Sequence, residues 1–214
     1  RLEPIKGVFV TFYPAGHILG AACVHIQSGG RSTLYTGDFS VASDHHLAGC
    51  SLPRLFPELL ITESTYGNRT REPVFKREKS FVHMVHRCLL NGGKVLIPVF
   101  AVGRLQEICL MLNSYWDRMG IQFPIYHSRG MGLDATKIYR NSARWMNPTI
   151  QSSYFDRERM LLDFGHVRPL EKGMQINSPS VVVATSGMLN VGVSYNLFVV
   201  EKWAEDPLNL IVFP

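Results

Sequence analysis

The chain has 214 residues, of which 46% are hydrophobic and 18% charged, and its formal net charge is +5 at pH 7. This composition can bury a substantial core in one large domain or two small ones. No apolar run approaches the roughly 18 residues that a membrane-spanning helix needs, so we expect no membrane partner. The four cysteines are scattered without a Cys-x-x-Cys pair, which argues against a zinc finger or a disulfide framework. The positive charge is compatible with a polyanionic partner but does not identify one.

Residues 1–67 are predicted to consist mainly of short strands. Apolar, strand-like segments cover residues 8–13, 22–27, 31–36 and 59–62. Glycine-rich turns separate them, notably Ser28-Gly29-Gly30, and no amphipathic helix interrupts the series. We therefore expect a first, strand-rich domain that ends at residue 67.

In residues 68–214, helices and strands are predicted to alternate. In chain order, the predicted elements are a helix over 73–91, a strand over 94–100, a helix over 104–119, a strand over 123–127, a helix over 134–146, a strand over 181–185, a helix over 195–203 and a strand over 210–213. Between residues 147 and 178 the pattern is weak, and only 155–162 is a candidate helix. Alternation of this kind predicts an α/β domain whose parallel sheet is flanked by helices.

Three side chains with possible chemical roles lie where strand-like segments meet glycine or small residues. They are His17, Asp38 and Glu63. A side chain at a strand end is held by a rigid element yet remains accessible, and His and Asp suit zinc as ligands. Taken singly, however, such a histidine is more often structural, and an aspartate after glycine often caps a turn. The residues alone leave both readings open.

The sequence around these residues resembles a known family. Segments 15–21, 35–39 and 60–67 resemble, in order and spacing, three successive motifs of the metallo-β-lactamase/β-CASP nucleases. Segment 92–107 resembles the signature stretch of the β-CASP region, and 184–189 resembles a later strand and turn of that region. The resemblance implies part of a metallo-β-lactamase αββα fold over 1–67 and a β-CASP domain over 68–214.

The resemblance also implies roles for the three strand-end residues. His17 would bind one zinc ion, and the Asp38 carboxylate would bridge two. Glu63 would hydrogen-bond a general-acid histidine and hold its tautomer. Asp38 and Glu63 are thus the expected catalytic residues, and His17 and Asp38 are the expected metal ligands.

The function that the resemblance implies is zinc-dependent hydrolysis of phosphodiester bonds during RNA 3'-end processing in the nucleus. Expected partners are RNA and the other subunits of a processing complex, including a β-CASP paralogue. The stretch from Gly92 to Tyr126 favours the Integrator type of endonuclease over the polyadenylation-factor type. The alternative is a non-catalytic β-CASP scaffold subunit, although the retention of His17, Asp38 and Glu63 argues against a degenerate paralogue.

Several family motifs are not found in these 214 residues. The sequence contains no His-x-His-x-Asp-His pattern, and it ends before the two further histidines that family members carry after the β-CASP region. Of the ligands for two zinc ions, only His17 and Asp38 are present, whereas a catalytic zinc site usually has three protein ligands. We therefore expect this chain to be inactive by itself and not to retain two zinc ions.

A separate prediction concerns RNA binding and follows from the expected parallel sheet. In open α/β sheets, ligands bind beyond the carboxyl ends of the strands. Three of the predicted strands are followed there by Arg104, by Arg129 and by Ser186-Gly187. Arginine and glycine-rich backbone both suit a phosphate ligand. The alternative is that the serine and the glycine make turns and that the arginines form surface ion pairs.

Overall fold

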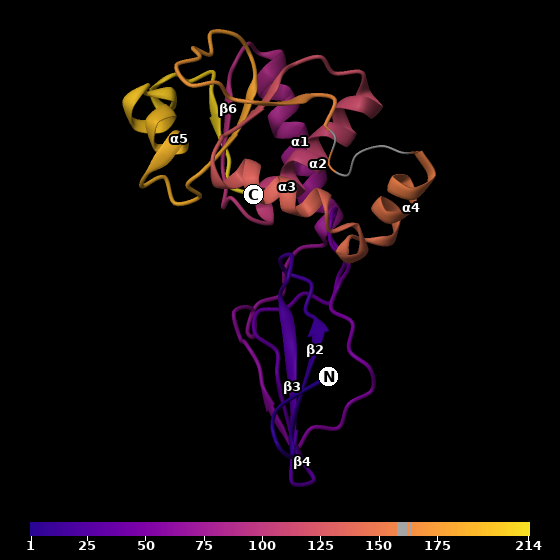
Figure 1. Cartoon of the computed structure of the whole chain (residues 1–214). Helices are drawn as coiled ribbons and strands as arrows, with labels where there is room; N and C mark the ends of the chain where they lie inside the picture. Colours follow the sequence, from indigo (N-terminus) through magenta and orange to yellow (C-terminus); the bar gives the residue numbers. More distant parts are fainter. Residues whose placement is uncertain (158–161, 163) are drawn as a thin grey trace. The chain divides into compact units, whose positions relative to one another are not determined.

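The computed structural model describes residues 1–157, 162 and 164–214 (Figure 1). The chain forms two compact units. Unit 1 contains Arg1–Arg71 and Ala143–Arg157, and unit 2 contains Glu72–Ser142 and Glu158–Pro214. The domain boundary after residue 67 therefore stays a prediction, and no sequence pattern indicates that 143–157 join unit 1.

Unit 1 is built on one five-stranded sheet with the strands in sequence order. Its elements are β1 (Leu2–Ile5), β2 (Val8–Pro14), β3 (Ala22–Ser28), β4 (Arg31–Tyr35), β5 (Leu59–Ile61), the 3-10 turn η1 (Ala143–Trp145) and α4 (Pro148–Arg157). Neighbouring strands are antiparallel except β4 and β5, which are parallel. Consequently β2, β4 and β5 all run in the same direction, and their carboxyl ends lie at one edge of the sheet.

The tight turn between β3 and β4 explains the register of this sheet. Gly29 and Gly30 have φ angles of 56° and 80°, and Ser28 pairs with Arg31 across them. Two consecutive positive φ angles define the type I′ turn that matches the twist of a hairpin.

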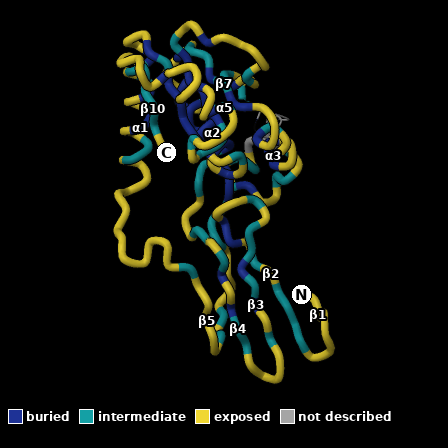
Figure 2. The backbone as a smooth tube through the Cα atoms, turned by 90° about the vertical axis from the view of Figure 1, so that its left-hand side faces the viewer, coloured by how far each residue is buried: buried dark blue, intermediate teal, exposed yellow. Residues whose placement is uncertain are grey.

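Ala15, Cys23 and Leu34 form the small buried core of this unit. Elsewhere its strands are mostly half-buried or exposed (Figure 2). Apolar side chains exposed on these strands include Leu2, Ile5, Phe12, Ile26, Leu59, Leu60 and Ile61.

Unit 2 is an α/β structure with a five-stranded, entirely parallel sheet in the order β10-β6-β9-β7-β8. Its elements are α1 (Val74–Leu90), β6 (Val95–Pro98), α2 (Arg104–Met119), β7 (Ile125–His127), α3 (Met131–Arg140), β8 (Val167–Pro169), β9 (Val181–Ala184), α5 (Gly192–Tyr195), the π-helical turn η2 (Asn196–Val200), the 3-10 turn η3 (Trp203–Glu205) and β10 (Leu210–Ile211). The predicted fold class, with a parallel sheet flanked by helices, is confirmed.

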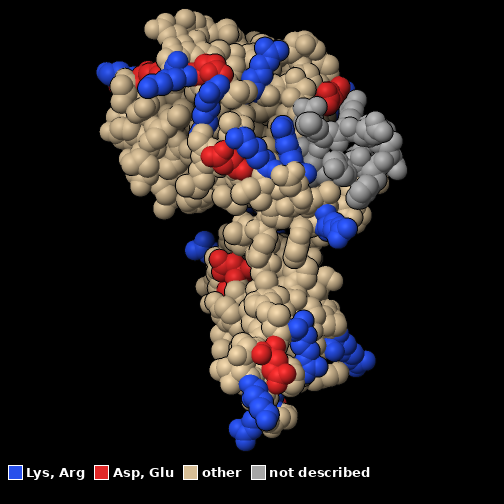
Figure 3. All heavy atoms as spheres, in the orientation of Figure 1, with Lys and Arg blue, Asp and Glu red and all other residues tan. Residues whose placement is uncertain are grey.

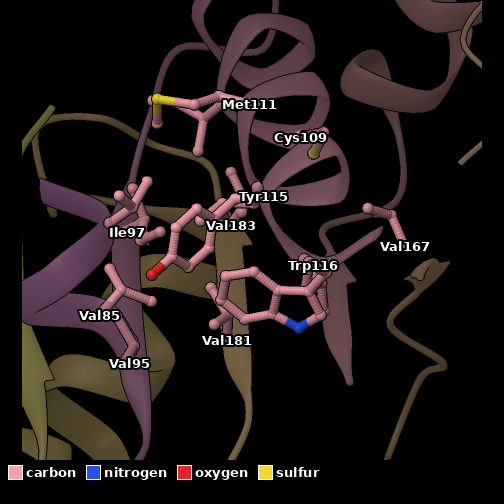
Figure 4. Close-up of a cluster of buried hydrophobic side chains, with 14 of the residues drawn as sticks. Val85, Val95, Ile97, Cys109, Met111, Tyr115, Trp116, Val167, Val181 and Val183 are labelled. Carbon is pink, nitrogen blue, oxygen red and sulfur yellow. The ribbon is translucent and has the colours of Figure 1, made fainter. Parts of the chain in front are cut away.

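The central strands β6 and β9 are buried on both faces. On one face, Val95, Ile97, Val181 and Val183 belong to the larger core together with residues of α1 and α2. Figure 4 shows Tyr115 and Trp116 of α2 lying against these valines. On the other face, Leu96, Val182 and Ala184 pack with Leu197 and Trp203. Continuous apolar strands of this type occur where helices cover both faces of a sheet.

Some predicted elements differ from the structure. The helix expected over 134–146 is two elements, because α3 ends at Arg140 with Asn141 as its C-cap and η1 follows. The helix expected over 195–203 is divided among α5, η2 and η3, and Lys202 adopts a left-handed φ of 55° at the break. The short strands β1 and β8 were not predicted. The helix α4 starts at Pro148, earlier than the candidate helix over 155–162, and part of that candidate lies outside the described residues.

Candidate functional site

His17, Asp38 and Glu63 lie together in unit 1. Each follows the carboxyl end of a strand, β2, β4 and β5 respectively, and these ends share one edge of the sheet. The Nε2 atom of His17 is 3.8 Å from the Oδ2 atom of Asp38. Their side chains are 47% and 68% exposed, so solvent and ligands can reach both groups. The structure therefore brings together the three residues that the sequence singled out.

The loop that carries His17 is held by close backbone packing. Gly16 has a φ of 68°, and a Cβ atom there would lie 2.6 Å from the carbonyl oxygen of Ser40. The Ser40 N–H in turn donates to the carbonyl oxygen of Ala15 at 2.9 Å. His17 itself has a φ of 59°, in the left-handed region that few residues other than glycine, asparagine, aspartate and histidine adopt. Only glycine at position 16 allows the backbone there to lie this close to the carbonyl oxygen of Ser40.

Glu63 is fixed by hydrogen bonds near the end of β4. Its Oε1 atom accepts a hydrogen bond from the Phe39 N–H at 3.2 Å. The side-chain hydrogen bond from Thr65, followed by the bond from Phe39, lowers the pKa of Glu63. The positive potential of nearby His17 acts in the same direction. Glu63 is therefore an ionised acceptor at neutral pH, as a residue that orients a histidine must be.

The donor set in this unit suits a metal but is incomplete. A histidine nitrogen and a carboxylate oxygen are both zinc ligands, yet structural zinc needs four protein ligands and catalytic zinc usually three. In residues 1–157, 162 and 164–214, no cluster of three or more His, Cys, Asp or Glu side chains is arranged to hold a metal ion. His17 and Asp38 alone cannot complete a site.

The predicted RNA-binding residues lie at the carboxyl edge of the sheet in unit 2, after the parallel strands β6, β7 and β9. Both arginines already have carboxylate partners. Arg104 Nη1 lies 2.5 Å from Glu107 Oε2, and Arg129 forms an ion pair with Glu171. The Arg104 and Arg129 side chains nevertheless remain 45% and 52% exposed.

The other predicted residues at this edge belong to a hydrogen-bonded turn. Ser186 Oγ donates to Asn190 Oδ1 at 2.7 Å. A Cβ atom on Gly187 would lie 3.2 Å from the backbone nitrogen of Phe100, so this glycine allows the turn after β9 to approach the end of β6. These contacts support the alternative that Ser186 and Gly187 make a turn.

Two features of the site region were not predicted. Gln106 is fully buried, and its side chain accepts from the Gly103 N–H at 2.8 Å and donates to the carbonyl oxygens of Ala101 and Gly132. It joins the start of α2 to α3, and its position on the apolar side of a helix was the available signal. In unit 1, Arg144 and Trp145 line a hollow beside the His17 loop, although the sequence suggested only that both belong to a helix.

Charges of both signs are mixed on one face of the molecule. On the face in Figure 3, Lys and Arg side chains are interspersed with Asp and Glu. Within the described part of the chain, every helix is too short or too polar to cross a membrane.

Comparison with known proteins gives consistent matches. Residues 105–214 match the Beta-Casp domain. Integrator complex subunit 11 of Danio rerio is 40% identical over 203 residues, which are 94% of this chain and 33% of that protein. Cleavage and polyadenylation specificity factor subunit 3 of Dictyostelium discoideum is 40% identical over 214 residues, covering 98% and 27% of the two chains. Endoribonuclease YSH1 of Saccharomyces cerevisiae is 35% identical over 216 residues, covering 97% and 27%.

This chain spans a third or less of the length of these relatives. The domain match nevertheless covers just over half of its residues, and most of the matched range belongs to the parallel α/β unit. The chain belongs to the metallo-β-lactamase/β-CASP RNA endonuclease family.

Proposed function

We propose that the full-length protein is a zinc-dependent endonuclease that hydrolyses phosphodiester bonds of RNA during 3'-end processing. The observation that carries this proposal is the grouping of His17, Asp38 and Glu63 at one sheet edge of a β-CASP family member. Relatives bear the names of RNA-processing subunits and endoribonucleases. A non-catalytic scaffold would have no need of an accessible histidine and carboxylate 3.8 Å apart.

In this proposal each residue has a defined task. His17 and Asp38 supply two of the ligands for the metal, and the remaining ligands come from parts of the protein beyond these 214 residues. When bound, the metal would lower the pKa of a water molecule and stabilise charge on the attacked phosphate. Glu63, ionised and held by the Phe39 N–H, would accept a hydrogen bond from a histidine and fix its tautomer.

The RNA strand would also be bound by unit 2. Arg104 and Arg129 would exchange their carboxylate partners for phosphate oxygens. The Gly187 N–H would be a further donor, because the Ser186 N–H already donates to the carbonyl oxygen of Val191 at 3.2 Å. An exposed ion pair such as that of Arg129 with Glu171 contributes only about 0 to 1 kcal/mol, so its exchange for a phosphate contact is energetically accessible.

We infer that the protein acts in the nucleus within a multi-subunit complex that includes a β-CASP paralogue. The Integrator type is preferred over the polyadenylation-factor type because of the stretch from Gly92 to Tyr126. Relatives of both types match this chain at 35% to 40% identity, so identity alone does not separate them.

The direct test is metal analysis combined with RNA cleavage. Full-length protein should contain zinc and cut single-stranded RNA, and a chelator should abolish cutting until zinc is restored. The 214-residue chain, purified in parallel, should hold fewer than two zinc ions and should not cut RNA. Cleavage by full-length protein that is insensitive to chelators would overturn the metal dependence, and the absence of RNA cleavage by an intact complex would favour the scaffold.

A further inference from the structure

A small hollow lies beside the loop that carries His17. Gly16 and Ile18, the two neighbours of His17, form one wall, and Ala48 and Gly49 form another. Trp145 and Arg144 also line it. All of these residues belong to unit 1. The hollow has a volume of about 100 Å³, far below the several hundred Å³ of a site for a drug-sized molecule. It is suited to a single planar ring.

Trp145 is held in position by the residues that follow it. Met146 is completely buried and forms a β-bridge with Leu47, which is itself buried. The Asn147 N–H donates to the carbonyl oxygen of His46 at 3.0 Å, and its side-chain amide donates to the carbonyl oxygen of Asp44 at 2.9 Å. We call this group of contacts the 146–147 clamp. It fixes the backbone at Trp145 without using the indole ring.

The Trp145 indole ring contributes little to the buried core. Trp145 is 49% exposed, whereas the other two tryptophans of the chain, Trp116 and Trp203, are 0% and 3% exposed. Tryptophan is a large apolar side chain, and leaving half of it in water beside an apolar hollow forgoes favourable burial. An exposed aromatic ring on a fixed backbone is the arrangement that binding sites for planar ligands use.

Arg144 adds a positive charge at the same hollow. Its side chain is exposed, and none of the carboxylates among the described side chains, those of residues 1–152, 162 and 164–214, forms an ion pair with it. Only its backbone carbonyl is engaged, as an acceptor for the Gln151 side chain at 3.4 Å. The guanidinium group is therefore available for an anionic ligand.

We propose that this hollow binds one base of the RNA strand, stacked on the Trp145 indole, while Arg144 contacts a phosphate of the backbone. The proposal rests on the proposed function, because it places this nucleotide next to the phosphate that reaches His17 and Asp38. An aromatic face, apolar walls and an adjacent cation are the features with which proteins bind single-stranded RNA. Stacking of this kind holds the strand beside the reacting phosphate without demanding a particular base.

The test compares RNA with and without a base at the contacted nucleotide. Full-length protein carrying Asp38→Asn, so that RNA is not consumed, is titrated with single-stranded RNA in which each nucleotide near the cleavage point is made abasic in turn. With Trp145 present, one abasic position should weaken binding by roughly 5- to 150-fold. With Trp145→Ala, intact RNA should bind more weakly by a similar factor, and that abasic position should have no further effect. Trp145→Phe should restore most of the dependence on the base.

Matched variants separate stacking from folding. Phe56→Ala removes another exposed aromatic ring of unit 1, 79% exposed with Arg54 beside it, and should leave RNA affinity unchanged. Met146→Ala removes a buried anchor of the 146–147 clamp and should lower the melting temperature, which Trp145→Ala should not. Arg144→Ala should reduce the salt dependence of binding by about one unit of slope.

The outcomes distinguish this proposal from the proposed function. RNA that is bound and cut normally by Trp145→Ala, with unchanged sensitivity to abasic positions, would overturn the stacking site and leave the endonuclease assignment intact. A fall in melting temperature for Trp145→Ala that Trp145→Phe reverses, without any effect of abasic positions, would show that the ring serves packing. Failure of the wild-type protein to bind or cut RNA at all would overturn the proposed function instead.

Discussion

The imidazole of His17 and the carboxylate of Asp38 lie 3.8 Å apart at their closest nitrogen and oxygen atoms, although they follow different strands. The antiparallel pairing of β2 with β3 and of β3 with β4 returns the chain to the same sheet edge. This separation is too long for a good hydrogen bond, and both side chains are accessible. The pair therefore contributes little to the fold, and in the proposed function it would share a ligand.

Replacing Asp38 with alanine in the full-length protein should reduce RNA cleavage by at least about 100-fold, because a proposed metal ligand is lost. Since the Asp38 side chain is 68% exposed, the melting temperature should change little. Cleavage assays, zinc analysis and thermal melting of the same preparation check this. Cleavage at the wild-type rate would show that the metal assignment is wrong.

Glu63→Ala should impair cleavage by about 10- to 100-fold while zinc remains bound, because the expected role of Glu63 is to orient a histidine and not to hold the metal. Glu58→Ala is the matched control. Its carboxylate accepts a hydrogen bond from the Ser32 N–H at 3.0 Å, also near β5, but lies outside the proposed site. Loss of zinc from Glu63→Ala, or equal activity losses in the two variants, would contradict the assignment.

The predictable parts of this structure are those that local pattern specifies. The apolar run that includes β6 predicted a buried parallel strand. The run is continuous because helices cover both faces of the strand, so that every side chain in it is buried. His17, Asp38 and Glu63 could be selected because each follows a strand and glycine or a small residue. The return of 143–157 to unit 1 could not be predicted, since it depends on the bridge between Leu47 and Met146, far apart in sequence. Local periodicity carries no signal for such a contact.

The arginines at the edge of the parallel sheet show a second limit on what can be predicted from sequence. The three-residue spacing from Arg104 to Glu107 within a predicted helix allowed for their ion pair, because residues so spaced are neighbours on a helix surface. The pairing of Arg129 with Glu171, in contrast, depends on the tertiary fold. Sequence identified which cations lie at the edge but not which of them have partners.

Replacing Arg104 and Arg129 together with alanine should weaken RNA binding to the full-length protein. Two lost phosphate contacts should flatten the salt dependence by about two units of slope. Because the Arg129–Glu171 pair is exposed and the Arg104 side chain is itself 45% exposed, the melting temperature should fall only slightly. Lys137→Ala, which removes an exposed cation paired with Asp134 on α3, serves as control and should affect neither property. An unchanged affinity and slope with a large fall in melting temperature would assign a structural role to these arginines.

Asp44, whose carboxylate lies beneath the 146–147 clamp, should make the stability of the fold depend on acid pH. Asp44 Oδ1 accepts hydrogen bonds from the N–H groups of Leu47 at 2.5 Å and His46 at 2.8 Å, and it lies 2.8 Å from His46 Nδ1. Burial by itself would raise the pKa of Asp44, but the hydrogen bonds and the charge of His46 outweigh it and lower the pKa below 3.8.

A carboxyl group whose pKa is lower in the folded state stabilises the fold above its unfolded pKa, and this contribution is lost as the pH falls through the folded value. The folded protein should therefore lose stability as the pH falls below about 4. Asp44→Asn should cost about 1 to 3 kcal/mol near neutral pH, from the weakened hydrogen bonds, and should reduce this acid dependence. Asp134→Asn, in an exposed pair, should change neither. Melting curves of the three proteins between pH 3 and pH 7 test this, and an acid dependence that is identical in Asp44→Asn and wild type would show that Asp44 does not control it.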